Sequence, residues 1–463
     1  MKIIIVGDGK VGFALAEHLS QEDHDVTVID SNDAALSRAA EALDVLCVKG
    51  NGASISALRE SGAENADVLI AATSMDEVNM VCCLTAKRMG AAYTIARVRG
   101  VEYMSELELL KQEMGIDMVI NPESSTAAEI ARLLRFPAAA HIETFCRGRV
   151  ELIAFRVQKG DFLCGKALSQ MEAKVRALPI LFCAVERDDK LKIPNGAFVP
   201  EEDDTLYVIG EPATIHQFFK ILGRYTPKIK DVILVGGGRI CHYLSAILIR
   251  LGMNVKVIEK EQATCRRLSE ALPKVTVICG DGTDQELLDA EDLAASDAFV
   301  ALTNRDEDNL IIALYALQQK VHKVIAKSNR QSYVSIAREA GLDSIISPKL
   351  ITAYQILQVV RGMEGSKGSV MNAMYKIADG KAEAMEFVAN ASTRHLGVPL
   401  RDLRIKRDVL LAVVIHKGKI VIPEGSTVMA EGDTVILISL DPNILDLNDI
   451  FEDVFSSVRE ALQ

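Results

Sequence analysis

The sequence predicts an α/β protein in which a Rossmann-like parallel-sheet domain followed by a small α+β module occurs twice in tandem. Three observations support this fold class. Apolar strands alternate with amphipathic helices, a glycine-rich turn joins the first strand to the first helix, and the same pattern starts again 229 residues later. Alternating strands and helices form parallel sheets with right-handed crossovers, and a repeat kept at one offset indicates duplication.

The glycine-rich turn has the context of a dinucleotide-binding turn. The apolar run Ile3-Ile4-Ile5-Val6 leads into Gly7-Asp8-Gly9-Lys10-Val11-Gly12, a G-x-G-x-x-G, and an amphipathic helix follows. In this pattern Gly7 permits the tight turn, Gly9 admits a pyrophosphate close to the backbone, and Gly12 lets the helix approach the strand. The bare N–H groups of the helix N-terminus then face the phosphates. A structural turn without a ligand is the alternative, but the flanking elements favour binding.

An acidic residue ends the second predicted strand. The strand Val26–Ile29 is followed by Asp30, 18 residues after Gly12. A carboxylate at this spacing accepts hydrogen bonds from ribose hydroxyls and repels a 2′-phosphate, which favours NAD over NADP.

Strands and helices continue in alternation. We predict strands over 43–48, 67–72, 93–98 and 118–120, and helices over 76–89 and 122–134. Pro122 after Asn121 is typical of a first helical position. From residue 140 to 224 the pattern changes to short strands over 152–157, 181–186, 190–193 and 205–209, which indicates a small α+β module.

The second half of the chain repeats the first. Matching pairs are Gly236 with Gly7, Glu259 with Asp30, Thr303 with Thr73 and Lys327 with Arg97. Segments of the small module recur at the same offset. We therefore predict Rossmann-like domains over 1–135 and 230–358, and small modules over 140–225 and 368–455.

The composition excludes several classes of protein. The 463 residues are 49% hydrophobic and 25% charged, with a formal net charge of −12. An acidic chain without a basic patch is not expected to bind nucleic acid. No apolar run approaches the ~18 residues that span a bilayer, and we expect no signal peptide because the first residues already form a strand. The nine cysteines and eight histidines form no metal or disulfide motif.

With these motifs, the chain resembles the RCK family, the regulators of K⁺ conductance, also called KTN domains. The resemblance rests on the start KIIIVGDGKVG, the GNG turn at 50–52 and the segment NPESSTAAEI, and it covers nearly the whole chain in two units. It implies a non-enzymatic, ring-forming regulator that binds NAD(H), and in relatives ATP or ADP. It also implies a cytoplasmic protein held at the inner face of the cell membrane by a Trk-type potassium transporter.

The resemblance assigns residues to a first nucleotide site. Those expected at the phosphates are Gly7, Asp8, Gly9, Lys10 and Val11, with Asp30 at a ribose, Thr73 and Ser74 against the ligand, and Arg97 at the phosphate end. These positions lie at carboxyl ends of strands, where open α/β sheets bind ligands. For Lys10, a charge on a terminal phosphate and a solvated lysine at a helix start are equally consistent with the sequence.

A second site is expected from the repeat, with altered residues. Its members are Gly236, Gly237, Gly238, Arg239, Ile240, Glu259, Thr303 and Lys327. Cys241 replaces the third glycine, and Glu259 reaches one methylene further than an aspartate. We expect the two sites to differ in nucleotide binding.

Two other functions are compatible with a dinucleotide fold. An NAD-dependent oxidoreductase would need an acid–base group beside the nicotinamide, and neither small module carries an evident set. A redox-sensing transcription factor would need a helix-turn-helix and a basic surface. We expect instead a homo-oligomer, a tetramer or at least a dimer, without direct insertion into lipid.

Overall fold

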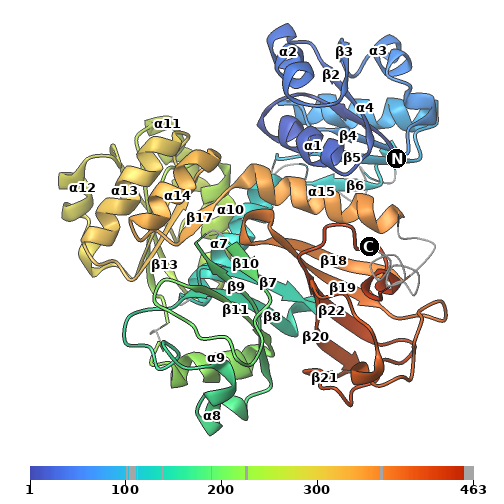
Figure 1. Cartoon of the computed structure of the whole chain (residues 1–463). Helices are drawn as coiled ribbons and strands as arrows, with labels where there is room; N and C mark the ends of the chain where they lie inside the picture. The colour runs from blue at the N-terminus through green and yellow to red at the C-terminus, as the bar shows by residue number, and fades with distance from the viewer. Residues whose placement is uncertain are drawn as a thin grey trace. The chain divides into compact units, whose positions relative to one another are not determined.

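The computed structural model of the chain describes residues 1–100, 103, 111, 113–137, 139–188, 190–224, 228–364 and 369–452. By its internal contacts the chain divides into two compact units. One unit combines residues 1–135 with 229–357 and contains two six-stranded sheets, and the other combines 136–228 with the chain from 358 onward and contains two five-stranded sheets (Figure 1). Equivalent domains of the two repeats therefore pack together, although they are far apart in the sequence.

The first six-stranded sheet is parallel throughout, with the order β3-β2-β1-β4-β5-β6. Between β1 and β4 the order reverses, and the carboxyl ends of strands at such a switch point are where open α/β sheets bind ligands. The elements are β1 (Lys2–Val6), α1 (Lys10–Gln21), β2 (Asp25–Asp30), α2 (Asp33–Ala42), β3 (Leu46–Lys49), α3 (Ile55–Glu60), β4 (Val68–Ala71), α4 (Asp76–Met89), β5 (Tyr93–Arg97), β6 (Met118–Ile120) and α7 (Pro122–Arg135).

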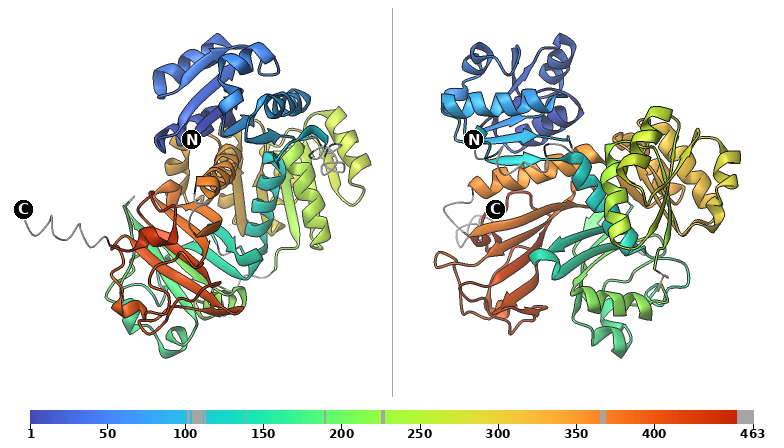
Figure 2. Two further views of the ribbon diagram at one scale, coloured as in Figure 1. Left: turned by 90° about the vertical axis from the view of Figure 1, so that its right-hand side faces the viewer. Right: turned by 180° about the vertical axis from the view of Figure 1, so that it is seen from behind.

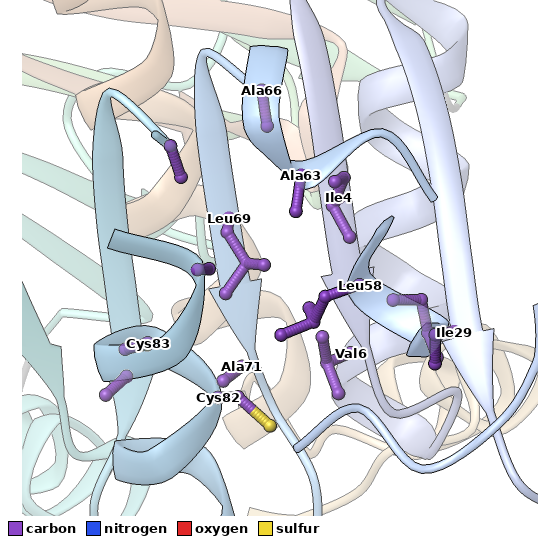
Figure 3. Close-up of a cluster of buried hydrophobic side chains, with 14 of the residues drawn as sticks. Ile4, Val6, Ile29, Leu58, Ala63, Ala66, Leu69, Ala71, Cys82 and Cys83 are labelled. Atoms are coloured by element: carbon purple, nitrogen blue, oxygen red, sulfur yellow. The ribbon is translucent and has the colours of Figure 1, made fainter. Parts of the chain in front are cut away.

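The core of this domain explains why β1 is apolar at every position. Ile4 and Val6 face one side of the sheet, where they pack with Leu58 of α3 and Cys82 of α4 (Figure 3). Successive strand residues point to opposite faces, so Ile3 and Ile5 face the other side. Since helices cover both faces of a parallel sheet, its central strands carry no polar alternation.

The second six-stranded sheet repeats the first, with all strands parallel in the order β14-β13-β12-β15-β16-β17. Its elements are β12 (Asp231–Val235), α10 (Arg239–Arg250), β13 (Asn254–Glu259), α11 (Gln262–Ala271), β14 (Thr276–Cys279), α12 (Gln285–Ala290), β15 (Ala298–Ala301), α13 (Asp306–Gln318), β16 (Lys323–Lys327), α14 (Gln331–Glu339), β17 (Ser344–Ile346) and α15 (Pro348–Glu364). The predicted tandem duplication of a parallel-sheet domain is confirmed.

The other unit contains two antiparallel sheets of equal topology, β10-β9-β11-β8-β7 and β18-β19-β22-β20-β21. The first module comprises β7 (His141–Phe145), β8 (Val150–Arg156), α8 (Ala173–Arg176), β9 (Ile180–Arg187), β10 (Lys190–Lys192), β11 (Thr205–Gly210) and α9 (Pro212–Ile221). The second comprises β18 (Val370–Ile377), β19 (Ala382–Val388), β20 (Val409–His416), β21 (Lys419–Val421) and β22 (Thr434–Ser439).

The two small modules share one hydrophobic core. Figure 2 shows the ribbons of the two small modules. Phe145 of the first module packs edge-to-face on Tyr375 of the second, with ring centroids 5.0 Å apart, and one buried cluster contains residues of both sheets. The hydroxyl of Tyr375 also donates to the carbonyl of Thr144 at 2.9 Å. Because a half-chain would expose this core to water, the two repeats are expected to fold as one polypeptide.

Three sequence predictions needed correction. The strand predicted over 43–48 begins only at Leu46, because Leu43 caps α2 and pairing with β2 starts at Thr27 opposite Leu46. Strand β7 and helix α9 were not predicted. The helix α9 buries Phe218 and Phe219 against Phe155, and with Ile215 these residues have the i, i+3, i+4 spacing of a buried helix face, a signal that is present in the sequence. Among the described helices, none combines the length and the apolarity needed to cross a membrane.

Candidate nucleotide site

The first glycine-rich turn has the geometry that the pattern predicts. Gly7 has φ +97°, and a Cβ there would lie 3.0 Å from the backbone of Thr73. A Cβ on Gly12 would lie 1.8 Å from the carbonyl oxygen of Gly7, whereas a Cβ on Gly9 would meet nothing within 4 Å. The turn therefore needs the first and third glycines for its own packing, and the second leaves open space at the start of α1.

Asp30 lies at the end of β2 and holds this turn. Its Oδ2 accepts a hydrogen bond from the backbone N–H of Asp8 at 2.6 Å, and its Oδ1 accepts one from Asn32 at 2.8 Å. Each carboxylate oxygen has a second lone-pair direction. The carboxylate thus fixes the turn and still has acceptor capacity for ribose hydroxyls.

Replacing Asp30 by alanine is expected to weaken NAD(H) binding by about 1.5–3 kcal/mol, the usual contribution of a hydrogen bond to a charged acceptor. Isothermal calorimetry on the full chain measures the change. Asp33→Ala is the matched control, because its exposed carboxylate forms a surface ion pair with Lys49. Unchanged affinity in Asp30→Ala would remove this residue from the site.

Asp8 was expected at the phosphates, but its side chain turns into the protein. Its carboxyl is 2% exposed, and Oδ2 lies 3.3 Å from Nη2 of Arg38 on α2. Burial raises the pKa of Asp8 to about 6, although Arg38 opposes the shift. The Arg38 guanidinium also donates to the Asp8 carbonyl at 3.1 Å. Asp8 therefore offers its backbone to the site, while its side chain links the turn to α2.

The ends of β4 and β5 are joined by a buried asparagine. Oδ1 of Asn79 accepts from the Thr73 N–H at 2.8 Å and from the Thr73 hydroxyl at 2.7 Å. Its Nδ2 donates to the carbonyl of Arg97 at 2.8 Å. The neighbouring Ser74 carbonyl accepts from Arg99. The predicted residues Thr73, Ser74 and Arg97 are thus held at one edge of the sheet.

The second turn repeats these contacts with its own residues. Glu259 accepts from the N–H of Gly237 at 2.6 Å and from that of Glu261 at 2.7 Å, as Asp30 does in the first turn. Asn309 bonds to Thr303 and to the carbonyl of Lys327. Gly236 has φ +104°, and Gly238 has open space like Gly9.

Cys241, which replaces the third glycine, is accommodated in the second turn. Its side chain is fully buried, with Sγ 3.8 Å from the hydroxyl of Ser245, and burial raises the pKa of its thiol to about 12. Ile240 is also buried beside it. A Cβ at this position is therefore tolerated in the second domain, although it would collide with backbone in the first.

Four cations of the two Rossmann-like domains lie within electrostatic range of one another in pairs: Lys10 and Arg239 begin α1 and α10, and Arg97 and Lys327 end β5 and β16. Burial lowers the pKa of Arg97, and Arg239 of the second turn acts in the same direction. Burial likewise lowers the pKa of Lys327, and the positive charge of Lys10 lowers it further. The sequence had placed these cations at two separate sites, whereas the structure brings them together.

The cation cluster of Lys10, Arg97, Arg239 and Lys327 is partly neutralised by three carboxylates: Asp306 and Glu123 oppose the lowering of the Lys327 pKa, and Glu123 and Asp76 oppose that of Arg97. Glu123 on α7 lies 3.5 Å from Nη2 of Arg97, and it opposes the lowering of the Lys327 pKa as well. Nε of Arg97 is buried without a hydrogen-bond partner among the described residues. This unfilled donor beside several cations suits an anion with several oxygens. Oε2 of Glu123 and Oδ1 of Asp306 are also buried without a hydrogen-bond partner among the described residues, so the same place offers acceptors for ligand hydroxyls as well.

A tyrosine of the second domain reaches into the first. The hydroxyl of Tyr243 on α10 donates to the carbonyl of Arg99 at 3.0 Å and accepts from Nδ2 of Asn121 at 3.0 Å. Helix α10 packs along α7, the helix that follows Asn121. The second turn is therefore mechanically connected to the strand ends of the first domain.

Several of these residues were not identified from the sequence. Arg38 and Tyr243 carry no motif, since each comes from an element remote from the turn it contacts, whereas Glu123 lies in the segment NPESSTAAEI but was not assigned to the site. Asn79 had a usable signal, because Asn309 recurs at the matching position in the second domain. The repeat indicated its position, but the hydrogen bonds that explain it appear only in the structure.

Family models match most of the chain. A model of the TrkA-N domain matches residues 3–122 and 232–348, and one of the TrkA-C domain matches residues 152–223 and 384–452. The solved structure of the GsuK channel bound to NAD has a similar fold, with a TM-score of 0.62 and 20% identity, covering 95% of this chain and 76% of that one.

Two relatives are similar along their full length. The Trk system potassium uptake protein TrkA homolog 2 of Methanosarcina mazei is 32% identical over 460 residues, which covers 98% of this chain and 100% of the relative. The Trk system potassium uptake protein TrkA of Halomonas elongata is 33% identical over 458 residues, covering 98% and 99%. The chain therefore belongs to the TrkA family of Trk-system potassium uptake proteins, a regulatory and non-enzymatic family.

Proposed function

We propose that the chain is a nucleotide-sensing regulatory subunit that binds NAD(H), and also ATP or ADP, and that gates a Trk-type potassium transporter subunit (TrkH or TrkG type) from the cytoplasmic face of the inner membrane. The observation that carries the proposal is the partly neutralised cation cluster at the carboxyl ends of both sheets, with the buried Nε of Arg97 lacking a partner. The four-domain division over 1–135, 140–225, 230–358 and 368–455 is part of this proposal.

The packing of the first turn determines where each part of the dinucleotide would bind. The open space at Gly9 admits the pyrophosphate to the N-terminus of α1, which has no side-chain cap. Asp30 would accept from a ribose hydroxyl. Thr73 and Ser74 would border the ligand, and Lys10 and Arg97 would meet its phosphates.

A nucleotide with a longer phosphate chain would use the cluster more fully. Phosphate oxygens leaving the first turn would approach Arg239 and Lys327 of the second domain, because these cations lie within electrostatic range of Arg97 and Lys10. Each additional phosphate adds charge to be neutralised. We therefore expect ATP and ADP affinities to fall more steeply with added salt than the NAD(H) affinity, since ionic strength screens such contacts.

Gating would follow from the repulsion within this cluster. Without a ligand, the like charges of the two turns oppose a close approach of the two domains. A bridging phosphate would bind the close arrangement more tightly than the open one. A ligand shifts a two-state equilibrium only through such a difference in affinity. Tyr243 would transmit the shift, since it ties α10 to the strand ends of the first domain.

A calorimetric titration of the full chain with NADH, NAD, ATP and ADP, each at low and high salt, tests the proposed function. We expect saturable binding without turnover when NADH is offered with carbonyl substrates. An absence of binding by all four nucleotides would overturn the nucleotide-sensing part of the proposal.

Assembly is expected to bury apolar residues that the single chain exposes. Ile311 on α13 is 62% exposed and Ile336 on α14 is 65% exposed, and Val81 occupies the position on α4 that matches Ile311. Light scattering is expected to report a homotetramer, or at least a dimer, that Ile336→Glu dissociates. Val199→Glu, at an exposed site of the first small module, is the control. A strictly monomeric mass for the unmodified chain would contradict this expectation.

The membrane partner is tested by flotation. The chain is expected to float with liposomes that contain the transporter and to stay in solution with protein-free anionic liposomes, because an acidic surface is not attracted to an anionic leaflet. Flotation with protein-free vesicles would contradict the absence of direct lipid insertion.

A further inference from the structure

Two cysteines of the second Rossmann-like domain meet beside its candidate nucleotide site. Cys265 lies near the start of α11 and Cys279 at the end of β14. Sγ of Cys265 donates to the carbonyl of Glu259 at 3.1 Å, and Sγ of Cys279 lies 4.0 Å from the carbonyl of Lys260. Cys279 is also the strand partner of Glu259 in the parallel pairing of β13 and β14. Both thiols therefore lie beside the backbone carbonyls of one two-residue segment, Glu259 and Lys260.

The two thiols differ in accessibility. All nine cysteines of the chain lie in the described residues, and Cys279 is the exposed one, whereas Cys265 is 6% exposed. The two thiols are near enough to affect one another: burial raises the pKa of the Cys265 thiol, and the neighbouring Cys279 acts in the same direction. An oxidant in solution is therefore expected to react first with the exposed Cys279, and the buried Cys265 is the nearby second thiol.

The first domain provides an internal comparison. Leu36 and Lys49 occupy the positions of Cys265 and Cys279, so no thiol pair can form there. Cys47 on the matching edge strand is half-buried, and its thiol donates to the carbonyl of Leu36 at 3.6 Å. The pair is therefore a feature of the second domain and not a consequence of the fold.

We propose that Cys265 and Cys279 form a reversible disulfide when the protein meets hydrogen peroxide, and that this bond lowers nucleotide affinity at the second turn. The thiolate of Cys279 attacks one oxygen of the peroxide, the O–O bond breaks, and a sulfenic acid forms while hydroxide leaves and takes up the proton that the Cys279 thiol released, which gives the first water. The Cys265 sulfur then attacks the sulfur of Cys279, so an S–S bond forms, the S–O bond breaks and a second water leaves. Two thiols lose two electrons, and the peroxide gains them.

The disulfide acts on the site through Glu259. When Cys265 bonds to Cys279, its thiol no longer donates to the Glu259 carbonyl, and the first turn of α11 is tied to the end of β14. The carboxylate of Glu259 holds the N–H groups of Gly237 and Glu261. A shift of this segment therefore displaces the turn that would receive the phosphates. A low-molecular-weight thiol reverses the change by thiol–disulfide exchange.

Peptide mapping of the full chain tests the disulfide. Trypsin cuts after Arg266 and Lys274, so the two cysteines fall in different peptides. After brief treatment with hydrogen peroxide and blocking of free thiols, we expect one cross-linked pair of peptides that contains Cys265 and Cys279, two hydrogen atoms lighter than the sum of its parts. A thiol reductant is expected to separate them. A Cys279–Cys279 link between chains, or Cys279 oxidised alone, would overturn the proposal.

Cysteine variants distinguish the specific Cys265–Cys279 disulfide from nonspecific thiol oxidation. Cys279→Ser is expected to abolish the cross-linked peptide, and Cys47→Ser is expected to leave it unchanged. In Cys265→Ser the reaction is expected to stop at a sulfenic acid on Cys279, which a 1,3-diketone traps. Equal cross-linking in the Cys279→Ser variant would contradict the assignment.

The effect of the disulfide on nucleotide binding rests on the proposed function. Its test distinguishes a failure of the redox effect from a failure of the nucleotide site. NADH and ATP titrations are compared for reduced, oxidised and re-reduced protein that carries Gly9→Ala, so that only the second turn is measured. We expect oxidation to weaken binding, re-reduction to restore it, and Cys279→Ser to be insensitive. Nucleotide binding unaltered by a verified disulfide would overturn the regulatory effect, whereas no binding by reduced protein would instead refute the proposed nucleotide site.

Discussion

The Gly9→Ala variant is expected to lose NAD(H) binding at the first turn while keeping its fold. Gly9 has an ordinary backbone conformation, with φ −73° and ψ −168°, and an added Cβ would meet nothing within 4 Å. An alanine there is compatible with the backbone, and the stability is expected to change little, because the gain through the unfolded state is opposed by the poorer capping of α1 by alanine than by glycine. The methyl group would, however, occupy the space through which a pyrophosphate approaches the backbone. We expect affinity at this turn to fall at least about tenfold, or about 1.4 kcal/mol.

Gly238→Ala is the matched variant in the second domain, where the backbone is nearly the same, with φ −71° and ψ −174°. Calorimetry of the two variants and of their combination assigns the binding to each turn within the full chain. This design is preferable to separate half-chains because the two small modules share a core. A Gly9→Ala variant with unchanged melting temperature and unchanged affinity would rule out the first turn as a phosphate site.

The Gly12→Ala variant is expected to destabilise the first Rossmann-like domain itself. The new Cβ would lie 1.8 Å from the carbonyl oxygen of Gly7, so α1 would have to move away from the turn. Overpacking usually costs about 1–3 kcal/mol and occasionally more, and a collision with backbone belongs at or above the upper end of that range. Urea unfolding of the full chain, followed by limited proteolysis of the first domain, measures the loss.

Cys241→Ala is the control for this prediction. The second domain already accommodates a Cβ at this position, so only the buried sulfur is lost, and a change near 1 kcal/mol is expected. If Gly12→Ala and Cys241→Ala destabilised the chain equally, the close helix–strand contact would not explain the glycine in the first turn.

Much of the site could be predicted because the relevant residues are close together in the sequence. The strand, the turn and the helix from Ile3 to Leu19 are local, and the periodicity of the apolar residues determines them. Asp30 follows the turn at a spacing set by one helix and one strand. The repeat added independent support, since Gly236 and Glu259 recur at one offset and the structure gives them the backbone contacts of Gly7 and Asp30.

The direction of the Asp8 side chain could not be predicted in this way. A carboxyl beside a phosphate turn has no sequence signal that distinguishes an outward orientation from burial against Arg38. Helix α9 is different, because Ile215, Phe218 and Phe219 have helical spacing and made it predictable from the sequence, whereas the packing of Phe218 on Phe155 of β8 appears only in the structure.

By itself, the sequence determined the parallel-sheet fold, its duplication, the two glycine-rich turns and the acids that hold them, because short-range patterns and spacings encode these features. Only the tertiary structure decided which turns meet. Lys10 and Lys327, Arg97 and Arg239, Tyr243 and Asn121, and the thiols of Cys265 and Cys279 are brought together by the packing of elements that are distant in the chain. Charge repulsion, burial and hydrogen bonding between such residues depend on distances in space, which no spacing along the sequence specifies.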